Sequence, residues 1–311
     1  MVDALWKNQR VLVTGGAGFI GSHLTRCLVD ASAEVIVLDD LSTGSRSQVP
    51  SAAELIVGSV ECRSTVEQAA ADCTAIIHLA ARVSVPQAEQ DPDGCRRVNV
   101  EGTANAVAAA SAGQARFVLA STCAVYGDPD SIPTSEATPV NPLSVYGQSK
   151  ASAESIVLDA IEQDRLQASC LRLFNVVGRG QNAASAYAAV VPRFAECLCA
   201  GRPPTIEGDG LQTRDFVPVG FVVDCLLRAA SSPVAPVVNV GTGHETSLLE
   251  LLERMQSIAG TALQPTFAAG RTGDIRRSVA DVETLHRDCG ACEPNRLGQA
   301  LRDVLDQHTP G

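Results

Sequence analysis

Lysine is almost absent from this chain, and tyrosine is nearly as scarce. The 24 basic residues comprise two lysines, Lys7 and Lys150, and 22 arginines, while tyrosine occurs three times in 311 residues. Lys150 follows Tyr146 by four positions, so a helix would place both scarce side chains on one face. A phenol and an ammonium in this arrangement can form an acid–base unit; the alternative is an exposed surface pair.

Positive charge in excess and long apolar runs are also missing. The net charge of -11 and the pI of about 4.9 argue against nucleic acid or an anionic membrane as a partner. Residues 1–10 lack the apolar core of a secretory signal, and no stretch reaches transmembrane length. Eleven cysteines without regular spacing favour free thiols in a reducing compartment. We therefore expect a cytoplasmic protein.

One cysteine-containing pattern could bind a metal. His286, Cys289 and Cys292 are spaced by two residues each and could supply three zinc ligands, with His308 distant in the sequence. Structural zinc sites usually need four ligands in close pairs. We therefore expect no metal site.

Strand and helix patterns alternate through the first half of the chain, which predicts a doubly wound α/β fold with a parallel sheet. Beyond Asn175 the segments become short and irregular, so we expect a smaller C-terminal α/β domain, with one strand returning to the sheet. The expected strands are 10–14, 34–39, 54–57, 75–79, 116–120, 168–173 and 237–240, and the expected helices are 22–31, 64–71, 93–112 and 147–164.

A glycine-rich turn links the first strand to the first helix. Gly15, Gly18 and Gly21 are each three residues apart, one residue different from the G-x-G-x-x-G form. Glycines at such a turn allow close backbone approach, and the helix N-terminus favours a pyrophosphate. Asp39 ends the second strand, where a carboxylate would bond the ribose hydroxyls of NAD and repel the 2′-phosphate of NADP. Because Arg46 follows a few residues later, NADP is not excluded as the cofactor. Asp39 could instead be a loop residue or a helix cap.

The residues after the strand at 116–120 form the second candidate site. Ligands of open α/β sheets bind beyond the carboxyl ends of the strands, which places Thr122 at the mouth of the site. We expect Thr122 to orient a substrate alcohol and Tyr146 to exchange its proton. An unperturbed tyrosine has a pKa of about 10, and an ammonium such as that of Lys150 lowers it.

Several motifs in a fixed order carry a family resemblance. The chain resembles the extended short-chain dehydrogenase/reductases, and in particular the nucleotide-sugar (UDP-hexose) 4-epimerases, most of all bacterial UDP-glucose and UDP-N-acetylglucosamine 4-epimerases. The resemblance covers about residues 10–285. The motifs are Thr14-Gly-Gly-Ala-Gly-Phe-Ile-Gly21, Leu38-Asp-Asp-Leu-Ser-Thr-Gly44, His78-Leu-Ala-Ala81, Tyr146-x-x-x-Lys150, Leu173-Phe-Asn175, Arg214-Asp-Phe216 and Asn239-Val-Gly-Thr-Gly243.

The resemblance implies a Rossmann-type NAD-binding domain over residues 1–174, with the return strand near 237–240, and a nucleotide-sugar domain over 175–311. It also implies a homodimer paired through the helices near 93–112 and 147–164, although those faces could be plain core. Thr122, Tyr146 and Lys150 would be catalytic. The cofactor NAD would contact Gly15, Gly18, Phe19, Ile20, Gly21, Asp39, Asp40, Ser59, Leu79, Ala80, Ala81, Asn99, Tyr146 and Lys150. The UDP-sugar would contact Ser84, Thr122, Asn175, Val190, Arg214, Arg271, Asp274 and Ser278.

Two departures from the family pattern bear on cofactor and reaction. Ser59 stands where many members carry an adenine-binding acid. Related dehydratases and decarboxylases carry an acidic residue where this chain has Cys123 and Ala124. The pattern thus favours C4 epimerisation through a transient 4-keto sugar.

In the family that the chain resembles, the position of Ser278 gates the sugar pocket, so this residue bears on which sugar is bound. Ser278 is small and leaves room for an N-acetyl group, so UDP-GlcNAc/GalNAc is favoured, with UDP-Glc/Gal also accepted. A UDP-glucuronate 4-epimerase, with Arg82 or Arg179 binding the carboxylate, is the first alternative. An NAD(P)-dependent nucleotide-sugar reductase and a non-catalytic NAD-binding protein are the others.

Overall fold

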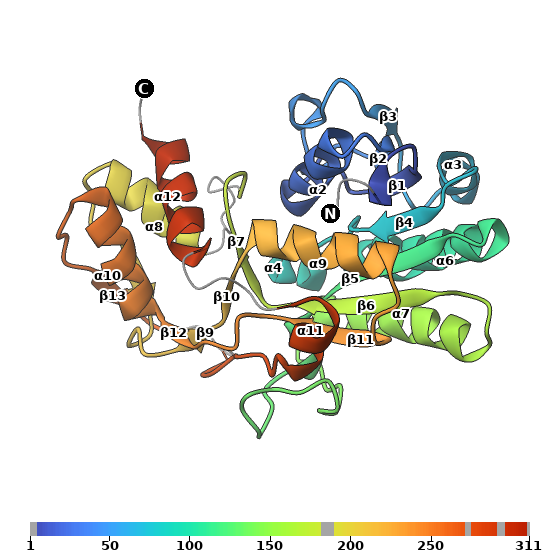
Figure 1. Cartoon of the computed structure of the whole chain (residues 1–311). Coiled ribbons are helices and arrows are strands. Elements are labelled where there is room, and N and C mark those ends of the chain that lie inside the picture. Colours follow the sequence, from blue (N-terminus) through green and yellow to red (C-terminus); the bar gives the residue numbers. More distant parts are fainter. Residues whose placement is uncertain (1–4, 182–189, 271–274, 291–295, 310–311) are drawn as a thin grey trace.

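A seven-stranded parallel sheet forms the centre of the molecule (Figure 1). The computed structural model describes residues 5–181, 190–270, 275–290 and 296–309. The strand order is β11-β6-β5-β4-β1-β2-β3, which confirms the doubly wound, Rossmann-type fold. The strands are β1 (Arg10–Thr14), β2 (Glu34–Asp39), β3 (Glu54–Val57), β4 (Ala75–His78), β5 (Arg116–Thr122), β6 (Ala168–Leu173) and β11 (Val237–Val240).

Helices cover both faces of the sheet because alternate strand residues point to opposite sides. Val11 and Val13 of β1 pack with α2 (Phe19–Asp30) and α9 (Val219–Ser231). Leu12, between them, packs with the helices of the other face. Those helices are α3 (Arg63–Ala69), α6 (Gly102–Gly113) and α7 (Val145–Glu162).

The helix expected over 93–112 is interrupted. It consists of α5 (Pro92–Arg96), a π-helical segment η2 (Arg97–Glu101) and α6. Asn99 lies in the π-helical segment, and its buried side chain bonds the backbone of Arg82 and the hydroxyl of Ser149. A π-bulge re-aims a side chain within a helix, and these contacts, distant in the sequence, stabilise it here.

A second group of elements has its own hydrophobic core beside the sheet (Figure 1). Helices α8 (Val190–Cys199), α10 (Leu248–Ala259) and α12 (Arg296–His308) pack together around Phe194, Leu251 and Leu301. We call this group the C-terminal lobe. Its short strands are β7 (Asn175–Val177), β8 (Thr205–Glu207), β9 (Thr213–Arg214), β10 (Phe216–Pro218), β12 (Thr246–Ser247) and β13 (Thr266–Ala268).

The chain crosses between the two parts more than once. After the first strands of the lobe, α9 packs on the sheet and β11 pairs in parallel with β6, from Val237 opposite Cys170 to Val240 opposite Leu173. The helix α11 (Glu283–Asp288) then lies against β11 before the chain returns to the lobe. Within the described residues, every helix is too short or too polar to span a membrane.

Candidate active site

The glycine-rich turn between β1 and α2 forms a narrow cradle. Gly15 has a φ of +70°, and a Cβ there would lie 2.7 Å from the Ala80 nitrogen, so a larger residue is excluded both by conformation and by space. A Cβ on Gly21 would lie 2.1 Å from the Gly15 carbonyl oxygen. The N-cap residue of α2 is Gly18, so no side chain of the cap accepts from the start of the helix. The first backbone N–H groups, from Phe19 and Ile20, are therefore open to a ligand. This cradle fits the pyrophosphate of a dinucleotide.

Asp39 fixes the far side of that cradle. Its Oδ2 accepts from the Ala17 N–H at 2.9 Å, and its Oδ1 accepts from the Leu41 N–H at 2.8 Å. Asp39 therefore holds the loop, and each carboxylate oxygen retains a further lone pair for a ribose hydroxyl. The neighbouring Asp40 is exposed and accepts from the Ser42 N–H. Ser59 bonds Glu61 through its hydroxyl.

His78 orders the loop that carries Leu79, Ala80 and Ala81. Thr14 Oγ1 lies 2.8 Å from His78 Nδ1 and accepts from the Ala80 N–H, so the threonine donates to Nδ1. On the other side, Thr103 donates to the Asn99 carbonyl and accepts from His78 Nε2. Burial, and secondarily the charge of Lys150, lower the His78 pKa to about 3. His78 is therefore a neutral structural histidine.

Asn99 joins this loop to α7. Its amide donates to the Arg82 carbonyl at 3.0 Å and to Ser149 Oγ at 2.9 Å, and its oxygen accepts from the Arg82 N–H at 2.8 Å. The structure thus shows Asn99 positioning the loop under the cofactor site. Its direct contact with NAD stays a prediction.

Thr122 ends β5 and lies beside Tyr146, which shares one face of α7 with Lys150. Ser144 caps α7 by accepting from the Gly147 N–H at 3.0 Å, and a Cβ on Gly147 would lie 2.8 Å from the Ala124 carbonyl oxygen. This close packing brings the Tyr146 phenol into hydrogen-bond contact with Thr122. Lys150 lies one helical turn further on and is 2% exposed.

The pKa of Tyr146 is shifted upward, whereas a lowered pKa was expected. Burial raises the pKa of Tyr146, and the hydrogen bond with Thr122 opposes this. Burial lowers the pKa of Lys150 to about 8, and Glu154 opposes this. The lowering of the Tyr146 pKa by Lys150 stays a prediction for the cofactor complex.

The expected substrate residues come from several elements. Asn175 begins β7 and donates its N–H to the Asp215 carbonyl, and Arg214 Nη1 donates to the Thr213 and Ile275 carbonyls, each at 2.7 Å. Ser84 caps the short helix α4 (Val85–Gln90), and Val190 begins α8. Arg271, Asp274 and Cys292 lie outside the described residues. Among the described residues no three His, Cys, Asp or Glu side chains are grouped to hold a metal ion.

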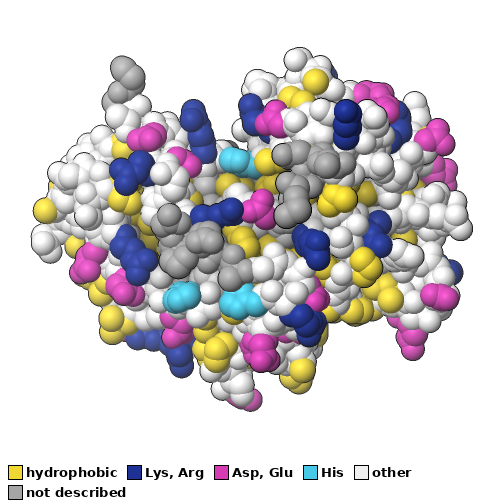
Figure 2. All heavy atoms as spheres, viewed as in Figure 1, with side chains coloured by type: hydrophobic (Ala, Val, Ile, Leu, Met, Phe, Trp, Pro, Cys, Tyr) yellow, Lys and Arg dark blue, Asp and Glu magenta, His cyan; other side chains and the backbone are white. Residues whose placement is uncertain are grey.

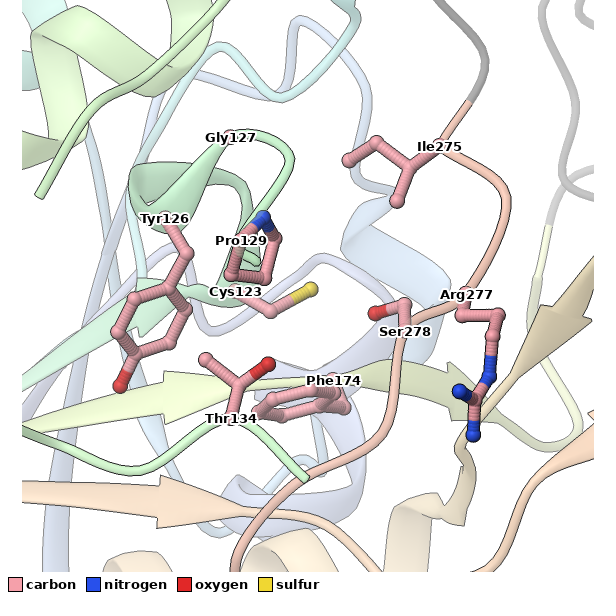
Figure 3. A pocket seen from close by; sticks show the side chains of 9 residues that line it. All are labelled: Cys123, Tyr126, Gly127, Pro129, Thr134, Phe174, Ile275, Arg277 and Ser278. Atoms are coloured by element: carbon pink, nitrogen blue, oxygen red, sulfur yellow. The ribbon is translucent and has the colours of Figure 1, made fainter. Parts of the chain in front are cut away.

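Cys123 and Ser278 face each other across a pocket of about 20 Å³ (Figure 3). The thiol and the hydroxyl are hydrogen-bonded, and burial raises the Cys123 pKa to about 11. Phe174, Ile275 and Arg277 also line the pocket. Ile275 and Arg277 come from the segment that carries Ser278. Cys123 was predicted only to be unfit for acid–base chemistry, and its place in the pocket wall is new.

Asp215 is a further residue whose role the sequence did not reveal. It is fully buried and accepts from the backbone N–H groups of Thr242, Gly243 and Ala280, and from the Thr242 hydroxyl at 2.6 Å. These bonds fasten the Ser278 side of the pocket to the end of β11. In the sequence, Asp215 was noted only as part of the motif Arg214-Asp-Phe216.

The two sites, for a dinucleotide and for a second ligand, adjoin one hollow of the surface. Figure 2 shows the molecule indented between the β1–β3 end of the sheet and the C-terminal lobe, with basic side chains on its walls. The fold, the glycine cradle and the Tyr146–Lys150 pair define an NAD-binding protein of the extended short-chain dehydrogenase/reductase type. Residues 11–241 match the model of the NAD dependent epimerase/dehydratase family. The chain belongs to this family, and NAD is its cofactor.

Individual relatives of this chain include both 4-epimerases and a dehydratase. A UDP-glucose 4-epimerase of Mycolicibacterium smegmatis is 39% identical over 282 residues, which is 88% of this chain and 90% of that protein. A UDP-N-acetylglucosamine 4-epimerase of Methanobrevibacter ruminantium, solved with UDP-N-acetylmuramic acid, is 30% identical, with a TM-score of 0.93 over 97% of this chain and 98% of that one. A dTDP-glucose 4,6-dehydratase of Streptomyces venezuelae with bound NAD is 26% identical, with a TM-score of 0.86 over 96% and 97% of the two chains. The chain is thus an enzyme of the epimerase/dehydratase family.

Proposed function

We propose that this enzyme is a UDP-hexose 4-epimerase. The observation that carries the proposal is the hydrogen-bonded Thr122 and Tyr146, with Lys150 one turn away, at the carboxyl end of β5. Relatives that are UDP-sugar 4-epimerases support the choice. Residues 1–174 would hold NAD and residues 175–311 the nucleotide sugar.

Each side chain has a separate task in this reaction. Tyr146 removes the proton from O4 of the sugar and returns it after the 4-keto sugar has turned over, while Thr122 holds the same oxygen. The Lys150 ammonium bonds the ribose and favours the Tyr146 phenolate. Bound NAD supplies reversible hydride transfer at C4. Asn175 and Arg214 would hold the diphosphate and uridine, together with Arg271.

The pocket wall supports epimerisation over dehydration. Elimination needs an acid or base beside Tyr146, and the Cys123 thiol, with its raised pKa of about 11, is protonated at neutral pH. None of the nine residues that line the described pocket is acidic.

The pocket wall also supports an N-acetylated sugar. Cys123 and Ser278 are both small, and small side chains at these positions leave more room for an acetamido group at C2 than a bulky residue would. UDP-GlcNAc/GalNAc is therefore the favoured substrate, with UDP-Glc/Gal also accepted. For a uronate, one of the two expected partners, Arg82, is already bonded to Asp91, which leaves Arg179 to bind the carboxylate. The cytoplasmic location and the homodimer stay predictions.

Replacing Tyr146 by phenylalanine tests the function. The variant keeps the ring but loses the proton-transferring oxygen, so turnover should fall by about 100-fold or more, while the circular dichroism spectrum stays unchanged. Turnover of the wild type is compared on UDP-Glc, UDP-GlcNAc and UDP-GlcA without added NADPH. Consumption of external NADPH, or full activity of the variant, would show that the proposal is wrong.

A further inference from the structure

The buried face of α7 continues past the catalytic pair to a carboxylate that the reaction does not use. Tyr146, Lys150 and Glu154 are spaced by four residues and lie on one face of the helix. Glu154 is 2% exposed, as is Lys150. A buried carboxylate beside a buried ammonium requires an explanation, because an unpaired charge is costly in the interior.

Glu154 is held in one position by three side-chain donors. Arg172 donates from Nη2 to Oε2 at 2.7 Å and from Nε to Oε1 at 3.0 Å, and the Ser121 hydroxyl also donates to Oε1. The side chains of Arg172 and Glu154 are 4% and 3% exposed. Such a bidentate, buried pair has one geometry only.

Arg172 is fixed in turn on its other side. Its guanidinium lies 4.7 Å from the centre of the Tyr126 ring, and the Tyr126 hydroxyl donates to Asn239 Oδ1 at 2.6 Å. The chain of contacts therefore runs from β11 through β6 to α7. It ends one helical turn below Lys150.

The charge balance around Lys150 points to Glu154 as its counter-ion. Arg172 is ion-paired with Glu154, and Lys150 lies one helical turn away on the same buried face of α7. Among the groups that influence Lys150, Glu154 is the largest that favours the ammonium. The other titratable groups that interact with Lys150 are His78, Cys95 and Cys170.

We propose that Glu154, fixed by Arg172 and Ser121, is a positioning residue that keeps Lys150 in its charged form one helical turn from Tyr146. The inference rests on the proposed function, because a charged Lys150 matters there for binding ribose and for the Tyr146 phenolate. Glu154 itself touches neither substrate nor cofactor in this proposal. It acts through its charge.

The scarcity of lysine makes a direct test practical. Protein labelled with ¹³C at lysine Cε gives two side-chain signals, from Lys7 and Lys150, and Lys7→Arg assigns them. The test variant is Glu154→Gln/Arg172→Met, which removes both charges so that no buried arginine is left alone; Glu154→Asp retains the carboxylate. The exposed pair Arg63 and Glu67, also four residues apart on a helix, provides the matched control Arg63→Met/Glu67→Gln.

In the double variant the Lys150 titration should move down by about one pH unit or more, and the alkaline limit of kcat/KM should move with it. Glu154→Asp and the control should keep the wild-type midpoint. An unchanged Lys150 midpoint in the folded double variant overturns the inference. Failure of the wild type to epimerise any UDP-hexose instead overturns the proposed function, while the NMR titration still decides the role of Glu154.

Discussion

Replacing His78 by glutamine should make the protein more resistant to acid. In the folded state burial keeps His78 neutral down to its pKa of about 3. In the unfolded chain the histidine side chain has its unperturbed pKa of about 6.5. Between these values the unfolded state binds one more proton than the folded state. The free energy of unfolding therefore falls as the pH falls.

The size of this effect follows from the two pKa values. Each pH unit below 6.5 costs the wild type about 1.4 kcal/mol, so the loss between pH 7.5 and pH 4.5 is about 3 kcal/mol. Glutamine can still donate to Thr103, and it carries no titrating group. The His78→Gln variant should lack this part of the loss, although it starts from a lower stability because the bond from Thr14 is weakened.

Urea unfolding at several pH values between 4.5 and 7.5 measures the difference. Carboxylates titrate in both proteins and cancel in the comparison. His244→Gln, at an exposed position, controls for the loss of one imidazole. Parallel curves for the wild type and His78→Gln would refute the assignment of a neutral, buried His78.

Three further outcomes are expected. Lys150→Arg should lower kcat by about 100-fold, because a site that buries Lys150 to 2% exposure has no room for the broader guanidinium; NAD binding and turnover measure it. Gly21→Ala should destabilise the protein by about 1–3 kcal/mol and weaken NAD binding, since its Cβ would lie 2.1 Å from the Gly15 oxygen; unfolding and NAD titrations show both. Ser278→Tyr should reduce turnover of UDP-GlcNAc by about tenfold or more relative to UDP-Glc, and an unchanged ratio of kcat/KM would contradict the position given to Ser278.

Most of the sheet was predictable because its inner strands are buried. Runs such as Val35-Ile-Val-Leu38 have one physical explanation, a parallel strand covered on both faces. The glycine turn and the Tyr146–Lys150 spacing were predictable for a similar reason, since each is a local pattern. The interruption of the 93–112 helix was not, because Asn99 bonds residues 17 and 50 positions away.

The same limit applies to the site. Glu154 and Arg172 are 18 residues apart, and Asp215 meets Thr242, Gly243 and Ala280 only after β10, β11 and the pocket segment have come together. A single sequence contains these residues but not their pairing. Cys123 shows the opposite case, because its chemistry was predicted while its place in the pocket wall depended on the folded position of Ser278.

The position of the catalytic pair on α7 has a consequence for how the enzyme can change. Tyr146 and Lys150 are spaced by the hydrogen bonds of one continuous helix, whereas Ser278 and Arg214 belong to segments that join the sheet through loops. Substitutions in those segments can enlarge or narrow the sugar pocket while the proton-transferring atoms keep their spacing. New substrates can therefore be acquired by mutation on one side of the hollow, at no cost to the chemistry on the other.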